Sequence, residues 1–458
     1  MNKHDKLLSF IYMGVMLAAA LYWAISADSL TVPGTVAAVA CWVLFTGLGL
    51  RAIPAFTSYL VSPGDPQKVA PTGPENGRQQ TWIRIVAWVL ASRVLLLLLA
   101  YVFRIIQNGY SGGLFETLTD TWHLQGIDAA SYLGIAERGY VTEGDARFHL
   151  VFLPFFPLVM KMVQIFVGDY LVAGFIVSNV CAVAAALFAY ELARLDLRRE
   201  EALRVVKYIF VFPSAFFFLI PMTESLFLLL SLMCLYYVRR KNWLLGCLCG
   251  ALAGFTRSPG ILLAVPVAVE MARDLITSYR VLDKKAFVRR FASAFICLAT
   301  ISLGLLAYLY VNYRVSGNAF QFSIYQREHW FQRLYLFFDT VRYQTEYAVR
   351  TFREGDIRSL LGLWLPNLVC IFAVLILMFQ SAKKLHPSYT LYFIVYFAYV
   401  VGPTWLLSAP RYFAVAFPLA FAAVLLTPDK RKDVVLTSLA IIGSALYLAV
   451  FVAGYPVY

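Results

Sequence analysis

The stretch VVLTSLAIIGSALYLAVFVAG, residues 434 to 454, contains no charged side chain and decides the class of fold. A helix of about 20 residues crosses the ~30 Å hydrocarbon core of a bilayer, so this run is long enough to span a membrane. Similar runs recur along the 458-residue chain, which is 61% hydrophobic and 14% charged, with a mean hydropathy of +0.71. This composition excludes an ordinary soluble globular protein and predicts an all-α polytopic membrane protein.

The apolar runs predict about 11 to 14 transmembrane helices, because some runs are short or interrupted by proline. They lie near residues 8–26, 33–50, 83–104, 151–167, 171–193, 205–219, 222–238, 242–256, 260–272, 291–312, 359–380, 388–407, 411–427 and 434–454. The segment VSPGDPQKVAPTGPENGRQ, which begins at Val61, is rich in proline, glycine and polar residues. It predicts a flexible cytoplasmic linker, 62–81, between an N-terminal transmembrane helix pair, 1–61, and a large membrane domain, 82–458.

The net charge of +13 comes from basic residues in short clusters between apolar runs. This distribution fits the positive-inside rule, so we expect a lipid bilayer and no nucleic acid as the partner of these residues. The clusters lie near residues 3–6, 51–78, 239–241, 273–290, 383–384 and 430–432. If these clusters are cytoplasmic, the loops 105–150 and 313–358 are external.

The rule leaves a conflict between residue 150 and the basic cluster that runs from Arg194 to Lys207. If the first is outside and the second inside, the chain between them crosses an odd number of times, yet it contains two apolar runs. Either the run FLPFFPLVMKMVQIFVG, which starts at Phe152, is partly re-entrant, or the basic cluster is external.

Polar residues at the ends of the predicted helices indicate a shared site. In the topology above, five segments that carry such residues reach the external membrane boundary. They are IDAASYLGIAERGY (Ile127–Tyr140), PMTES (Pro221–Ser225), FTRSPG (Phe255–Gly260), QREHW (Gln326–Trp330) and SAPRY (Ser408–Tyr412). We therefore expect Asp128, Glu224, Arg257 and Arg411 to converge there.

Each of these charged residues also has a simpler interpretation. Asp128 fits a solvated loop acid or the N-cap of a helix that begins at Ala129 and ends at Gly139. Arg257 and Arg411 fit anchors whose side chains extend to the membrane interface. Glu224 is harder to explain in this way, because a carboxylate beside an apolar run is costly unless it is paired or used.

The order and spacing of these motifs resemble the PIG-V-like mannosyltransferase family, over roughly residues 85 to 425. The matching residues are Asp128, Tyr132, residues 135–137, Gly139, Tyr140, FLPFFPLV at 152–159, residues 213–230, Arg257 with Gly260, and Arg411-Tyr412 with Phe417-Pro418. The family usually has Trp and an aromatic residue where this chain has Ile127 and Ser131. This departure affects the expected shape of the sugar pocket and leaves the aspartate in place.

The resemblance implies a GT-C-type fold with an external catalytic loop after the third helix, and makes 82–458 the catalytic domain. It implies an inverting mannosyltransferase that moves a sugar from a polyprenyl-phosphate sugar donor to a hydroxyl of a glycolipid or cell-envelope glycan acceptor. Asp128 is then the candidate base that takes the acceptor proton. Arg257 and Arg411 are candidates to stabilise the leaving phosphate.

Further substrate contacts are expected from the remaining polar and aromatic residues of the motifs. Glu224 would orient an arginine or the acceptor, and Trp330 would stack on the sugar. His149 fits either a polar pocket residue or an interfacial side chain. The complete set of expected substrate-binding residues is Tyr132, His149, Glu224, Arg257, Gln326, Trp330, Arg411 and Tyr412.

The sequence requires no metal or other cofactor. Ala130 stands where a D-x-D motif beside Asp128 would need its second aspartate, so we expect a reaction without an obligatory divalent metal. The seven cysteines lie inside apolar runs, which argues against a disulfide framework.

A multi-pass transporter and a non-catalytic membrane subunit are the alternatives. Against a transporter, the ionisable residues gather at one boundary and no inverted repeat is visible. We expect a multi-pass protein of a bacterial cell membrane, with the active site outside the cytoplasm.

Overall fold

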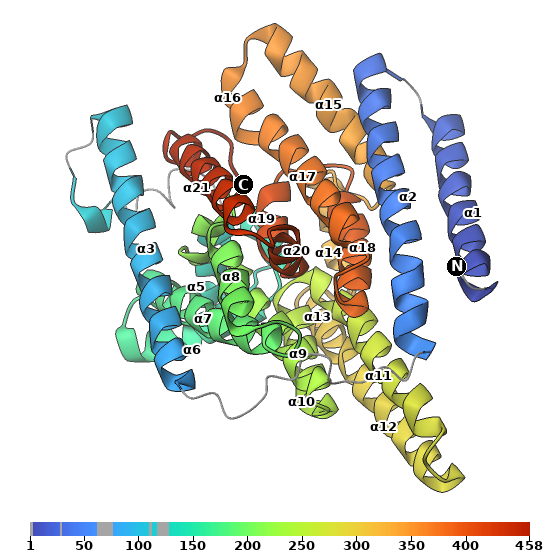
Figure 1. The fold of residues 1–458 in the computed structure, drawn as a ribbon. Helices are drawn as coiled ribbons and strands as arrows, with labels where there is room; N and C mark the ends of the chain where they lie inside the picture. Colours follow the sequence, from blue (N-terminus) through green and yellow to red (C-terminus); the bar gives the residue numbers. More distant parts are fainter. Residues whose placement is uncertain (1–2, 28–29, 62–76, 110–111, 117–127) are drawn as a thin grey trace.

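The computed structural model describes residues 3–27, 30–61, 77–109, 112–116 and 128–458, and these form helices joined by loops (Figure 1). An isolated antiparallel bridge joins Leu334 to Pro403. In chain order the helices are α1 (Lys3–Ser26), α2 (Val32–Val61), α3 (Arg78–Asn108), α5 (Asp128–Arg138), η1 (Asp145–Val151), α6 (Phe155–Val167), α7 (Tyr170–Ala193), α8 (Arg199–Phe210), η2 (Ala215–Phe218), α9 (Glu224–Arg239), α10 (Trp243–Thr256), η3 (Ser258–Leu263), α11 (Ala264–Tyr279), α12 (Lys284–Thr300), α13 (Ser302–Ser316), α14 (Gln321–Glu328), α15 (Phe337–Glu354), α16 (Ile357–Ser359), η4 (Leu360–Trp364), α17 (Leu365–Ser381), α18 (Pro387–Val401), α19 (Ala409–Ala414), α20 (Pro418–Leu426) and α21 (Lys430–Val452). The prediction of an all-α polytopic membrane protein is confirmed.

Seven segments among the described residues are long and apolar enough to cross a membrane, fewer than the 11 to 14 helices expected from the sequence. The missing spans are short helices such as α9 and α10, with 16 and 14 residues, which are largely buried inside the bundle. An apolar run of this length is typical of a core helix, and hydrophobicity alone does not distinguish the two cases. The seven segments are His4–Ser26, Val32–Val61, Arg78–Gln107, Tyr170–Ala193, Lys284–Ser316, Ile357–Ser381 and Lys430–Val452.

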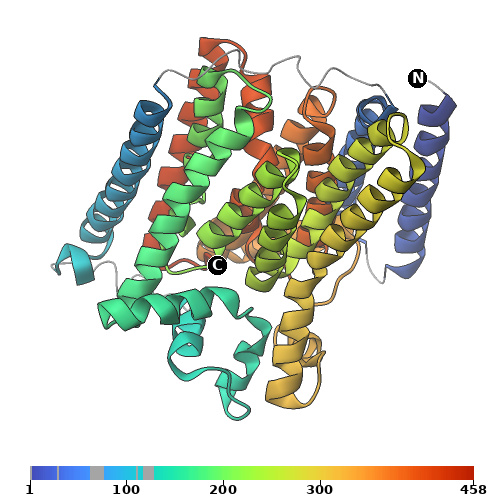
Figure 2. The same ribbon diagram turned by 90° about the horizontal axis from the view of Figure 1, so that it is seen from below.

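The chain between residue 145 and α7 turns sharply instead of continuing as a straight span. The axes of η1 and α6 are bent by 108° at the break between them. Gly168, with a φ of +80°, then ends α6, and the Asp169 carboxylate accepts a hydrogen bond from the Val172 N–H at the start of α7. Figure 2 shows α6 lying across one end of the bundle, in a different direction from α7. The bend fits either a broken span or a re-entrant segment, and α7 is the one straight helix between residue 150 and Arg194 that is long and apolar enough to span a membrane.

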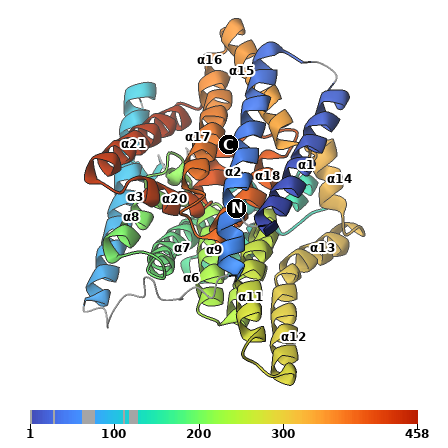
Figure 3. The ribbon, with the colours of Figure 1, turned by 45° about the vertical axis from the view of Figure 1, so that its right-hand side comes forward.

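The N-terminal helix pair packs on the rest of the bundle, with α1 and α2 side by side along its outside (Figure 3). The Trp23 Nε1–H donates to Asp339 at 2.7 Å, and the Phe45 ring lies 4.3 Å from that of Phe337, both on α15. The last residues of the predicted linker, 78–81, belong to α3, which begins at Arg78. The other linker residues 62–76 lie outside the described residues.

Candidate active site

Arg257 occupies the turn where α10 ends. Its backbone is extended, with φ −148° and ψ 141°, and η3 begins directly after it with Pro259 in its first turn. The turn folds tightly back onto α10, since a Cβ on Gly260 would lie 2.3 Å from the Gly254 nitrogen. No side chain fits at Gly260 without moving this backbone, so the glycine fixes the position from which Arg257 projects.

Arg411 lies on the short helix α19, whose start is held by a buried asparagine of α17. The Asn367 side-chain oxygen accepts from the Ala409 N–H at 2.9 Å, and its amide nitrogen donates to the Leu406 carbonyl at 3.3 Å. Asn367 is only 1% exposed, and Pro410 presets the first turn of α19. These contacts place Arg411 and Tyr412 beside the end of α10.

The two carboxylates of the site stand at helix N-termini. Asp128 is the first residue of α5 and Glu224 the first of α9, where the helix dipole favours negative charge. As predicted, α5 ends at Gly139, which has a φ of +76° and donates its N–H to the Ile135 carbonyl at 2.8 Å. Thus α5 and α9 both direct a carboxylate toward the arginines.

The four side chains form an alternating row that we call the acid–arginine chain: Asp128, Arg411, Glu224 and Arg257. The Arg411 Nη2 donates to the Asp128 Oδ2 at 2.6 Å, and its Nε lies 3.1 Å from the Glu224 Oε1. The Arg257 Nη1 donates to the same Glu224 oxygen and, at 3.0 Å, to Thr223. Two acids thus balance two arginines.

Burial increases along the acid–arginine chain toward Glu224. The side chains of Asp128, Arg411 and Glu224 are 29%, 8% and 0% exposed. Burial by itself would lower the pKa of Arg411, but the neighbouring Asp128 and Glu224 carboxylates outweigh it and raise that pKa. Both arginines are thus buried and paired with carboxylates, rather than extended away from the protein.

Asp128 also differs from its simpler interpretations. Its carboxylate accepts a hydrogen bond from Arg411, and no backbone N–H of the described residues donates to it. The aspartate is therefore neither a freely solvated loop acid nor an N-cap within the part of the chain that the structure describes. One of its oxygens is committed to Arg411, and the partly exposed side chain faces a cavity.

That cavity, which we call the charged cavity, has a volume of about 280 Å³. Of the residues expected at the site, those that line it are Asp128, Tyr132, Arg257, Gln326, Trp330, Arg411 and Tyr412. Glu224 lies behind the arginines and contacts the cavity only through them. The convergence expected from the helix-end motifs is thus present in the fold.

Aromatic rings shape the charged cavity. Tyr132 is 6% exposed and packs edge-on against Phe152 and Phe156, with ring centroids 5.2 and 5.6 Å apart. The Trp330 ring is edge-on to that of Phe152, with ring centroids 6.1 Å apart. Tyr412 lies 4.9 Å from the Arg257 guanidinium. A cavity with aromatic walls and a polar end suits a ligand with both an apolar face and charged groups.

His149 is not among the residues that line the charged cavity. It lies on η1, where its Nε2 is 3.4 Å from the Ser131 hydroxyl and its ring is edge-on to Phe152. Burial, with a further contribution from Arg138, lowers the pKa of His149, so the ring is neutral at pH 7. The structure places it beside the wall, in agreement with the non-pocket alternative.

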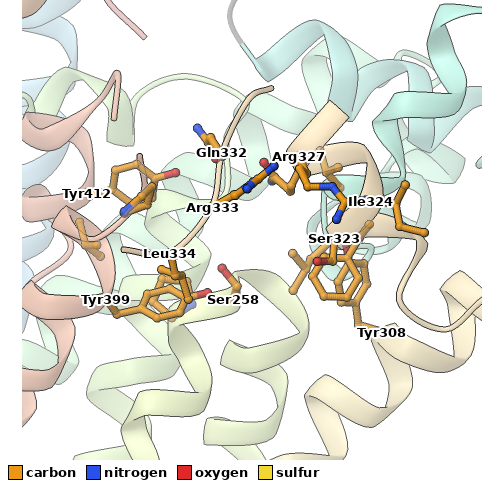
Figure 4. A pocket seen from close by; sticks show the side chains of 17 residues that line it. Ser258, Tyr308, Ser323, Ile324, Arg327, Gln332, Arg333, Leu334, Tyr399 and Tyr412 are labelled. Carbon is orange, nitrogen blue, oxygen red and sulfur yellow. The ribbon is translucent and has the colours of Figure 1, made fainter. Parts of the chain in front are cut away.

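A second cavity of about 570 Å³ adjoins the first, and we call it the arginine cavity (Figure 4). Residues lining both cavities are Val151, Leu153, Ser258, Pro259, Gln326, Gln332, Pro403 and Tyr412. Arg327 and Arg333 line the arginine cavity alone. Sequence reasoning missed Gln332, Arg333 and Trp405, because they lie in loops without a distinctive motif.

Family models, curated proteins and solved structures give no match to this chain. The candidate site therefore rests on the residues and their geometry. Within the described residues, no three His, Cys, Asp or Glu side chains are grouped so as to hold a metal ion. The metal-independence of the reaction stays a prediction.

Proposed function

We propose that this protein is an inverting glycosyltransferase of GT-C type, and specifically a mannosyltransferase of a bacterial cell membrane. It would move a sugar from a polyprenyl-phosphate donor to a hydroxyl of a lipid-linked or envelope glycan acceptor, on the non-cytoplasmic side. The observation that carries this proposal is the meeting of Asp128, Arg257 and Arg411 at one cavity from three distant parts of the chain.

The proposed reaction assigns one role to the carboxylate. The acceptor oxygen attacks the anomeric carbon, the bond from that carbon to the phosphate oxygen breaks, and the acceptor proton passes to Asp128. Asp128 suits this role because its side chain is 29% exposed at the cavity, while Arg411 holds one of its oxygens at 2.6 Å. A base held in this way cannot rotate away from the acceptor.

The two arginines stabilise the leaving group. The departing polyprenyl phosphate gains negative charge, and guanidinium groups in a site shielded from water stabilise it. The side chains of Arg257 and Arg411 are 7% and 8% exposed, and Glu224 fixes both from behind. When Asp128 accepts the proton and becomes neutral, Arg411 loses the partner charge just as the phosphate gains charge, so the total charge of the site is unchanged.

The test is direct. Purified protein in lipid nanodiscs is incubated with radiolabelled polyprenyl-phosphate mannose and a panel of membrane glycolipid acceptors, and the products are separated and analysed by mass spectrometry. A labelled glycolipid with inverted anomeric configuration is expected. Vectorial movement of the donor across the membrane without any new glycosidic bond would instead favour the transporter.

A further inference from the structure

The arginine cavity differs from the charged cavity in its balance of charge. Among the described residues that line it, two are arginines and none is an aspartate or glutamate. In the charged cavity, by contrast, Arg257 and Arg411 are already paired with Glu224 and Asp128. Uncompensated positive charge in a concave site attracts anions.

The two arginines of this cavity lack strong internal partners. The Arg327 Nη2 lies 3.8 Å from the Glu328 Oε1, and both side chains are more than half exposed, at 52% and 59%. An ion pair as exposed as this one contributes little stabilisation to either side chain. No ion pair involving Arg333 is present among the described residues. Both guanidinium groups are thus available to a ligand.

The backbone at Arg333 is nevertheless fixed. Its N–H donates to the Thr404 hydroxyl at 3.0 Å, and its carbonyl accepts from the Thr404 N–H at 2.7 Å. The next residue, Leu334, forms the bridge with Pro403. Figure 4 shows Arg327 and Arg333 on the same rim of the cavity, with Ser258 and Tyr399 across from them. A fixed backbone that carries an exposed guanidinium group is suited to binding an anion.

The rest of the lining indicates what accompanies the anionic group. The Gln326 Oε1 is buried without a hydrogen-bond partner among the described residues, and Ser258 and Ser323 supply hydroxyls. Leu334 and Val400 add apolar surface. A cavity of this volume is large enough for a sugar ring that carries a phosphate. Because Gln326 and Tyr412 line both cavities, one ligand can reach from Arg333 to Asp128.

We propose that the arginine cavity binds the acceptor, and that the acceptor is a glycoside bearing a phosphate group held by Arg327 and Arg333. This inference rests on the proposed function, because it assigns the donor to the charged cavity and the acceptor to its neighbour. The shared chemistry is that of a sugar phosphate, whether free or linked to a lipid.

Binding without transfer tests the inference. Protein in nanodiscs is titrated with three probes: octyl glucoside, octyl glucoside 6-phosphate and free glucose 6-phosphate. The phosphorylated glycoside is expected to bind about tenfold or more tightly than the neutral one, since charge-assisted contacts of this kind are strong. Comparing the two phosphorylated probes distinguishes the sources. Tighter binding of octyl glucoside 6-phosphate than of glucose 6-phosphate identifies a lipid-linked acceptor. Equal binding of the two identifies a free sugar phosphate.

Arg327→Gln and Arg333→Gln are each expected to reduce the preference for phosphate, and the double variant to abolish it. Arg353→Gln is the matched control, because Arg353 is an exposed arginine of α15 outside both cavities. Retention of the preference in a folded double variant would overturn the proposal. Competition by undecaprenyl phosphate for the probe would also overturn it, since the cavity would then hold the donor.

These outcomes separate the inference from the proposed function. A phosphate preference that depends on Arg327 and Arg333, in a protein that transfers no sugar, would retain the anion site and reject the glycosyltransferase. Full transfer to a neutral acceptor by the double variant would retain the glycosyltransferase and reject the phosphorylated acceptor.

Discussion

Replacing Arg411 by lysine keeps the positive charge but removes the separate nitrogen atoms that contact two carboxylates. Arg411 contacts Asp128 at 2.6 Å through Nη2 and approaches Glu224 at 3.1 Å through Nε. A lysine has one nitrogen, which cannot reach two carboxylates on opposite sides and also face a phosphate. At least one charge-assisted contact is lost, of ~1.5–3 kcal/mol, which corresponds to roughly a ten- to hundredfold fall in rate.

The assay is kcat/KM for sugar transfer from polyprenyl-phosphate mannose, measured for Arg411→Lys beside the parent and Arg353→Lys. The exposed Arg353 is the control for a change of arginine to lysine as such. The fall should be larger in kcat than in the affinity for acceptor, because the phosphate gains charge in the transition state. Near-normal kcat/KM in a folded Arg411→Lys protein would refute the phosphate role and leave Arg411 as a structural partner of Asp128.

Three further predictions concern stability and topology. Glu224→Gln leaves two buried arginines short of a counter-charge and should destabilise the fold by about 3–5 kcal/mol; an unchanged thermal midpoint would show that the acid–arginine chain does not need Glu224. His386 precedes α18, and burial together with the charge of Arg239 lowers its pKa to about 4. Between pH 4 and about 6.5 the unfolded chain therefore binds one more proton at this residue than the folded protein does. Stability should therefore fall as the pH drops through this window, and His386→Gln should flatten the unfolding profile; an identical slope in both proteins would contradict this. A cysteine at the exposed Glu143 should react with an impermeant maleimide on intact cells, over a low background because six of the seven native cysteines are buried; labelling only after permeabilisation would reverse the topology.

The site was more predictable from the sequence than the number of spans. Arg257 and Arg411 each lie beside the end of an apolar run, and Asp128 lies in a loop expected on the same side, so the expected topology brings the three near each other. The exact partners were not predictable, because the contact of Glu224 with both arginines depends on how α9, α10 and α19 pack. Packing of this kind arises from contacts between residues far apart in the chain, and hydropathy does not encode it.

The differences between the expectations and the structure have physical causes in particular segments. The expected count of spans exceeds the seven long apolar segments because it includes α9 and α10, which are apolar yet short and bury much of their surface against protein. The bend before α6 depends on a break between two helices, and a hydropathy profile does not resolve such a break. The arginine cavity was not predicted, because Arg333 is positioned by Thr404, a residue from a distant loop.

In the proposed reaction, Asp128 takes the proton of the acceptor hydroxyl. Asp128→Asn keeps the size of the side chain and one hydrogen-bond acceptor for Arg411, but removes the basic carboxylate. The decisive measurement is single-turnover sugar transfer by folded Asp128→Asn protein at saturating donor, with donor binding measured in parallel. We expect a rate lower by about a hundredfold or more with donor binding retained. A rate within a few-fold of the parent would contradict it, and the base would then have to be sought elsewhere in the charged cavity.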